Sequence, residues 1–70
     1  MKKGKLGEII QRRRESLSIK QEDLAEMSGI TAKTIYLIEQ GKGNPSIDTL
    51  LKIMEVLGLD ISLHVKKIEV

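Results

Sequence analysis

The chain has 70 residues, one histidine, no cysteine, neither Phe nor Trp, and a net charge of +2, and 40% of its residues are apolar. A chain this short forms one small domain with a thin core, so we expect a second chain to contribute to its stability. Because the sequence has no thiolates, no apolar run of ~20 residues and no nucleophile–base pair or metal cluster, we predict a cytoplasmic protein without catalytic residues, metal or cofactor.

Basic residues gather in the first part of the chain. Residues 1–42 hold nine Lys and Arg against six Asp and Glu, whereas residues 43–70 hold three against four. A basic half is what a surface that binds phosphates needs. An ordinary solvated face would show the same excess, so charge alone leaves both interpretations open.

The chain opens with a basic segment, residues 1–5, which we predict to be a flexible tail. A helix is expected from about Leu6 to Leu17, because Leu6, Ile10 and Leu17 fall on one face. Three consecutive arginines, residues 12–14, point in nearly all directions around this helix. At least one of them should therefore turn inward or sideways towards a carboxylate.

Residues 20–41 have the pattern of two short helices joined by a tight turn. The first is expected over residues 21–27, with Leu24 and Ala25 on its inward face. Gly29 suits the left-handed conformation that ends a helix.

The second helix of this pair is expected to begin after Thr31, whose side-chain oxygen can accept from a free backbone N–H, and to run through Gln40. It buries Ile35 and Ile38 at a spacing of three residues. Two helices with this spacing indicate a helix-turn-helix, in which the second helix lies in the major groove of DNA.

Lys20 occupies the cap position of the helix over residues 21–27, and lysine is a poor cap. A nearby DNA phosphate would accept from the unsatisfied N–H groups and would also pair with the lysine charge. A slightly weaker helix start without any function explains the same residue, and both interpretations stay open.

A flexible turn over residues 41–45 is followed by Ser46, which can cap a further helix over residues 47–57. Gly58 ends this helix. The core-facing stripe consists of Leu50, Ile53, Met54 and Leu57.

The end of the chain changes its period, because residues 60–66 alternate strictly between polar and apolar. This alternation is typical of a half-buried strand, with Ile61, Leu63 and Val65 facing the helices. A lone strand leaves its backbone groups unpaired, so we predict antiparallel pairing with the same strand of a second copy about a twofold axis. A disordered tail is the alternative.

Several short motifs occur in order along the chain and at characteristic spacing. They are Leu6-Gly7-x-x-Ile10, Arg14, Gln21-x-x-Leu24-Ala25, Gly29-Ile30-Thr31, Thr34-Ile35, Ile38-Glu39-x-Gly41 and Pro45-Ser46-x-x-Thr49-Leu50. Together they resemble the phage-repressor-like (Cro/XRE) helix-turn-helix family over residues 6–60. Within that family, residues 57–63 are similar to the HipB-type antitoxins, which are small dimeric repressors that end in a strand shared between subunits.

The resemblance implies a mainly α, lambda-repressor-like fold, with a four-helix domain over residues 6–59 and a dimerisation strand over residues 60–70. The implied partners are double-stranded DNA and a second copy of the chain. The implied function is that of a repressor or autorepressor on a palindromic operator whose half-sites lie about one helical turn apart. One alternative is a HipB-like antitoxin that neutralises a co-encoded kinase-type toxin. Another is a restriction-modification controller, although controllers usually end in a helix.

The resemblance also implies roles for particular residues. Gln21 matches a glutamine that contacts a DNA phosphate and braces the recognition helix, and Arg14 and Glu39 match an internal ion pair between the first and third helices. The base-facing positions are Ala32, Lys33, Tyr36 and Leu37. The expected phosphate contacts are Lys20, Gln21, Thr34, Lys42, Asn44 and, at the first helix, Arg13 or Arg12.

The base-facing side chains limit the chemistry of recognition. Lys33 can donate to guanine O6 and N7 or to a phosphate, whereas Ala32 and Leu37 offer only apolar contact, for instance to a thymine methyl group. Tyr36 either contacts bases or sugars or packs back on the neighbouring helix. Because the Gln, Asn and Ser readers frequent in this family are missing here, DNA shape is expected to add to direct readout.

Overall fold

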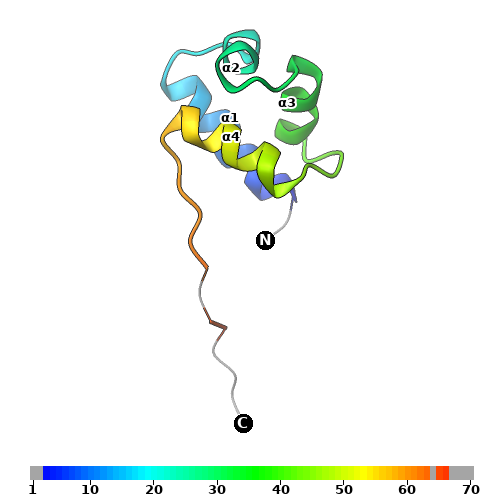
Figure 1. Cartoon of the computed structure of the whole chain (residues 1–70), viewed down its shortest axis with the longest axis vertical. Helices are drawn as coiled ribbons and strands as arrows, with labels where there is room; N and C mark the ends of the chain where they lie inside the picture. The colour runs from blue at the N-terminus through cyan, green and yellow to red at the C-terminus, as the bar shows by residue number, and fades with distance from the viewer. Residues whose placement is uncertain (1–2, 64, 67–70) are drawn as a thin grey trace.

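The computed structural model describes residues 3–63 and 65–66, and the described part is mainly helical (Figure 1). Its elements are α1 (Lys3–Ser16), α2 (Gln21–Ser28), α3 (Ala32–Glu39) and α4 (Ile47–Leu57). In Figure 1, α1 and α4 run side by side, and α2 and α3 lie across them. The prediction of a mainly α fold with four helices is confirmed. None of the helices within the described ranges has both the length and the apolarity to cross a membrane.

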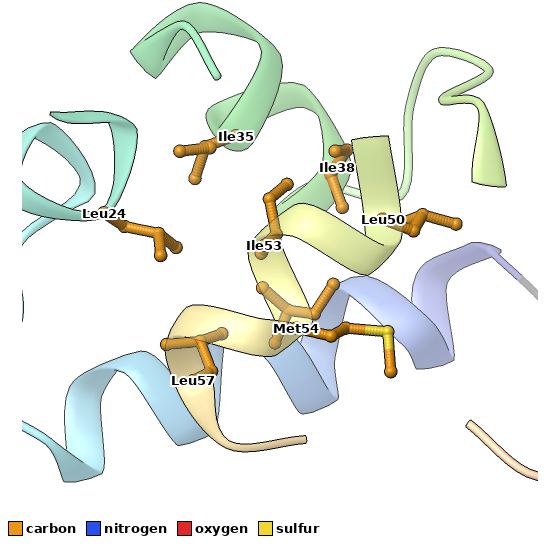
Figure 2. Packing of buried hydrophobic residues seen from close by; sticks show 8 residues of the cluster. Leu24, Ile35, Ile38, Leu50, Ile53, Met54 and Leu57 are labelled. Atoms are coloured by element: carbon orange, nitrogen blue, oxygen red, sulfur yellow. The ribbon is translucent and has the colours of Figure 1, made fainter. Parts of the chain in front are cut away.

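A single apolar cluster at the centre of the domain joins all four helices. Its members are Ile10 of α1, Leu24 of α2, Ile35 and Ile38 of α3, and Leu50, Ile53, Met54 and Leu57 of α4. Figure 2 shows Ile53 between Leu24 and Ile38, with Ile35 above it. Burial of each such side chain contributes roughly 1.5–3 kcal/mol, so the spacing of apolar residues along each helix determines which face turns inward.

Helix α1 begins at Lys3, three residues before the predicted start at Leu6. Residues 3–5 therefore belong to the helix and not to a flexible tail, while residues 1–2 lie outside the described residues. Lysine has a good helix propensity and no stop signal precedes Leu6, so the helix continues towards the start of the chain. At the other end, Leu17 lies beyond the last helical residue and is 40% exposed, although it was predicted to face inward.

The turn after α1 contains an unusual backbone conformation at Ser18, which has a φ of 58°. The N–H of Ser18 donates to the Glu15 carbonyl at 3.0 Å, and the N–H of Ile19 donates to the Arg14 carbonyl at 3.2 Å. This is the Schellman pattern, in which glycine normally occupies the left-handed position. A left-handed serine costs about 1 kcal/mol relative to glycine, and Ser18 is the one described residue other than glycine that has a positive φ.

The segment after α4 leaves the domain surface as extended chain (Figure 1). No strand occurs within residues 59–63 and 65–66, and residues 64 and 67–70 of the predicted strand lie outside the described residues. Leu63 is 93% exposed and Val65 is 98% exposed, so the prediction that they face the helices is wrong for the single chain. Ile61 is 42% exposed. A strand needs a neighbouring strand to satisfy its backbone, and this chain supplies none among its described residues.

Candidate nucleic-acid interface

The start of α3 is determined by two threonines. The side chain of Thr31 accepts a hydrogen bond from the N–H of Thr34 at 3.2 Å, and the Thr31 hydroxyl donates to the Thr34 hydroxyl at 2.9 Å. The first bond satisfies one of the backbone N–H groups that a helix start leaves without a partner. The helix therefore begins directly after Thr31, as its sequence predicts.

The two faces of α3 differ sharply in their environment. Ile35, Ile38 and Glu39 are buried, and these residues hold the inner face against the domain. On the outer face, Lys33 is exposed and Tyr36 is 48% exposed. About half of the Tyr36 surface is therefore open to solvent, and both interpretations, contact with DNA and packing on the neighbouring helix, stay predictions. The other two predicted base-facing residues are Ala32 and Leu37, both of which are half-buried.

Gln40 is a further exposed residue on the outer side of α3 that the sequence prediction missed. It is the C-cap residue and lies four positions after Tyr36, so the two side chains project from the same side of the helix. A primary amide can both donate to and accept from the edge of an adenine. Gln40 lies three positions after Leu37 and four after Tyr36, and this helical spacing is the signal in the sequence that places it on the outer face.

A buried polar network holds the inner end of α3. Arg14 Nε donates to Glu39 Oε2 at 2.7 Å, and a second guanidinium nitrogen donates to Glu39 Oε1 at 3.0 Å. The remaining nitrogen of Arg14 donates to the Ile19 carbonyl at 2.8 Å. Gln21 Nε2 donates to Glu39 Oε1 at 3.0 Å, so the carboxylate connects α1, α2 and α3.

The physical reason for this network lies in the position of Glu39. It is the last residue of α3, where the carbonyl end of the helix already carries partial negative charge. A buried carboxylate is unfavourable there unless donors surround it. The pKa of the Arg14 guanidinium is raised because Glu39 accepts its hydrogen bonds, although burial opposes this effect. The bidentate pair therefore determines how the end of α3 sits on α1.

Two expected phosphate contacts lie at the start of α2. The Lys20 side chain makes no cap hydrogen bond, while the Lys20 backbone N–H donates to Asp23 Oδ2 at 3.0 Å. Gln21 is half-buried and uses one amide hydrogen on Glu39. Since an amide nitrogen carries two hydrogens, the second can donate to a phosphate. The exposed Lys20 ammonium group directly precedes Gln21 in the chain.

The other expected phosphate contacts lie near the two ends of α3. Thr34 is half-buried in the first turn, and its hydroxyl accepts from Thr31. After the helix, the N–H of Lys42 donates to the Leu37 carbonyl at 2.8 Å, so the turn folds back against the last turn of α3. Lys42 and Asn44 are exposed in this turn. Both side chains can therefore reach an anionic backbone that runs past the end of α3.

Arg13, which was also expected at a phosphate, has a different contact in the structure. Its Nε donates to the Leu57 carbonyl at 2.8 Å, at the C-terminal end of α4. Arginine commonly satisfies the last carbonyls of a helix in this way. Because α4 has 11 residues, this contact lies about 16 Å along α4 from the turn that follows α3. The neighbouring Arg12 pairs with Glu8 on the surface of α1 at 2.6 Å.

In sequence, the chain is similar to known helix-turn-helix proteins. The sequence model described as Helix-turn-helix matches residues 10–63, which is more than half of the chain. A protein of Methanococcus maripaludis, named as a proposed HTH-type transcriptional regulatory protein, is 40% identical over 55 residues, which cover 79% of this chain and 17% of that protein.

Two bacterial proteins show similar identity. An uncharacterized HTH-type transcriptional regulator of Haemophilus influenzae is 40% identical over 50 residues, covering 71% of this chain and 51% of that protein. The HTH-type transcriptional regulator PuuR of Escherichia coli is 43% identical over 49 residues, covering 70% of this chain and 26% of PuuR. The chain thus spans between 17% and 51% of the length of these curated relatives.

Proposed function

Since this chain belongs to the helix-turn-helix family, we propose that it binds DNA in a sequence-specific manner and represses transcription, including that of its own operon. One observation supports this proposal above all others. The inner face of α3 is held by buried Ile35, Ile38 and Glu39, while Lys33 and Tyr36 project into solvent from the outer face. A rigid helix with such an outer face has the shape and chemistry that enter a major groove.

In the proposed complex, α3 lies in the major groove and its outer residues meet the base edges. The Lys33 ammonium group donates to guanine O6 and N7, and the Gln40 amide pairs with the donor and acceptor of adenine. The Tyr36 ring packs on a base or a sugar, and Ala32 and Leu37 contact thymine methyl groups. These contacts specify the sequence, because each base pair presents its own pattern in this groove.

The residues around α3 orient the protein on the duplex without reading its sequence. We propose that the following residues contact DNA phosphates: Lys20, Gln21, Thr34, Lys42 and Asn44. Gln21 has a double role, because the same amide nitrogen can donate to Glu39 inside the domain and to a phosphate outside it. One side chain thereby links contact with the phosphate backbone to the orientation of α3 on the domain.

Selection of duplexes from a random-sequence pool tests the proposal. We expect the protein to enrich a palindromic sequence with half-sites about one helical turn apart. Affinity for the enriched duplex should fall by about 10³ or more between 50 and 200 mM salt, because neutralised phosphates release counterions. Anisotropy titrations with a labelled duplex measure both results. If the selection enriches no sequence, or if the affinity does not change with salt concentration, the proposal is contradicted.

A palindromic operator requires two recognition helices related by a twofold axis, so we propose that the protein acts as a homodimer. Support comes from the tail, where Leu63 and Val65 are almost fully exposed in the single chain. Antiparallel pairing of residues 60–66 with the same segment of a second copy would cover these side chains.

Truncation after Leu59 is expected to give a monomer that keeps its four helices. The affinity for the selected duplex should then fall by about 10² or more, because the second half-site is no longer bound at a high effective concentration. Analytical ultracentrifugation and anisotropy measure the two effects. The full-length variant Lys66→Ala is the control, since it keeps Leu63 and Val65 and should remain dimeric. A truncated chain that still sediments as a dimer would exclude pairing through the tail.

A further inference from the structure

The crossing of α1 and α3 brings two backbones into close contact at Gly7. Gly7 is buried in the middle of α1, and its neighbours are the carbonyl groups of Ile38 and Glu39 at the end of α3. A Cβ atom at this position would overlap the Ile38 oxygen and would lie 3.0 Å from both the Ile38 carbonyl carbon and the Glu39 oxygen. A glycine inside a helix lowers its stability relative to alanine, so its presence here calls for a packing reason.

The backbone oxygen that a side chain at position 7 would displace already accepts a hydrogen bond. The Ile38 carbonyl accepts from the N–H of Gly41 at 3.0 Å, in the turn that ends α3. Backbone atoms inside a bonded turn cannot rotate away as a flexible side chain can. A side chain at position 7 would therefore separate the two helices by on the order of 1 Å rather than deform one residue.

The same end of α3 is held a second time by α1, two turns further along. There Arg14 binds the Glu39 carboxylate through two nitrogens. Gly7 and Arg14 are seven residues apart and lie on one face of α1. The end of α3 therefore contacts α1 at two positions, about two turns apart. One turn earlier in α3, Ile35 is buried in the core, so α3 is held at two places along its own length, and the contacts at its end determine its inclination.

We infer that Gly7 is a positioning residue for sequence recognition: its missing side chain sets the inclination of α3, and thereby the reach of Lys33 and Tyr36 into the groove. This inference rests on the proposed DNA-binding function. Hydrogen bonds to base edges weaken with small displacements, whereas the attraction between lysines and phosphates changes little over 1 Å. Displacing α3 should thus impair discrimination between sequences more than it impairs binding to DNA in general.

The test compares Gly7→Ala with Gly4→Ala, which makes the same substitution in the same helix. A Cβ atom at Gly4 has nothing within 4 Å, so this control adds a side chain without a clash. For each protein, anisotropy gives the affinity for the duplex selected by the wild type and for a scrambled duplex of equal length and composition. We expect the ratio of the two affinities to fall about tenfold or more in Gly7→Ala and to stay at the wild-type value in Gly4→Ala.

This ratio separates positioning from folding. A partly unfolded variant would lose affinity for both duplexes in proportion, so its ratio would not change. If Gly7→Ala does not fold, it is measured together with Ser18→Gly, which relieves the left-handed serine after α1. A Gly7→Ala protein with an unchanged ratio, or a double variant that still fails to fold, would overturn the inference. A wild-type protein that does not distinguish the two duplexes would instead refute the proposed function itself.

Discussion

Replacing Lys33 and Tyr36 together by alanine is expected to abolish specific duplex binding while the chain stays folded. Both side chains project from α3 into solvent, so their removal leaves the core intact. Each lost base contact should raise the free energy of specific binding by about 1–3 kcal/mol. Together they should reduce the affinity for the selected duplex about thirtyfold or more, to the level of the scrambled duplex. Anisotropy measures the affinities, and circular dichroism measures the fold.

The matched control for this pair lies elsewhere on the surface. Lys52 is exposed on α4 and Met27 is 59% exposed on α2, so Lys52→Ala with Met27→Ala removes one charge and one large apolar side chain. This control should keep the wild-type preference for the selected duplex. If the variant with Lys33→Ala and Tyr36→Ala kept that preference as well, the outer face of α3 would not be the reading surface.

Arg14→Ala is expected to lower the stability of the domain by about 3 kcal/mol, because it leaves a buried carboxylate without its main partner. The side chain of Glu39 has no exposed surface, and among the described residues only the amide of Gln21 would still donate to it. For a domain of this size, such a loss corresponds to a fall in Tm of roughly 12–24 °C. Thermal unfolding followed by circular dichroism measures it. The core of so small a chain supplies only about 3–5 kcal/mol, so the variant would keep about 0–2 kcal/mol, and up to about half of its molecules would be unfolded.

Two companion variants establish the cause of this loss. Arg12→Ala breaks an ion pair whose side chains are 76% and 45% exposed, so its effect should stay within about 0.5 kcal/mol. Arg14→Met combined with Glu39→Met removes both buried charges and should recover most of the lost stability. Equal effects of Arg12→Ala and Arg14→Ala would show that burial of the Arg14–Glu39 pair does not matter.

The helices could be predicted from the sequence because each carries its own local signals. Thr31 and Ser46 begin α3 and α4 as expected, and the apolar spacing identified Ile35, Ile38 and the stripe of α4. The first helix was placed less well: it begins three residues earlier than predicted, because lysine favours a helix and no stop signal precedes Leu6, and Leu17 lies beyond its end. Local patterns thus predict elements and their inward faces well.

The contacts between helices could not be predicted in the same way. The hydrogen bond of Arg13 to Leu57 and the close approach at Gly7 join residues that lie more than 30 positions apart, and no periodicity along the chain reports such pairs. The ion pair of Arg14 with Glu39 was expected through the family resemblance and not through any pattern of charges. The tail presents the opposite case, because the strand predicted from its alternation would need a second chain to pair with. The strand pairing and the antitoxin alternative both depend on the tail and stay predictions.

The hydrogen bond from Arg13 to the Leu57 carbonyl has a consequence for operator spacing. It ties the C-terminal end of α4 to α1, so the point where the tail leaves the domain is fixed. If two copies pair through their tails about a twofold axis, their reading helices should favour one separation and one mutual rotation. Inserting a single base pair between half-sites lengthens the duplex by about 3.4 Å and turns one half by about 35°, which so rigid a pair could not follow.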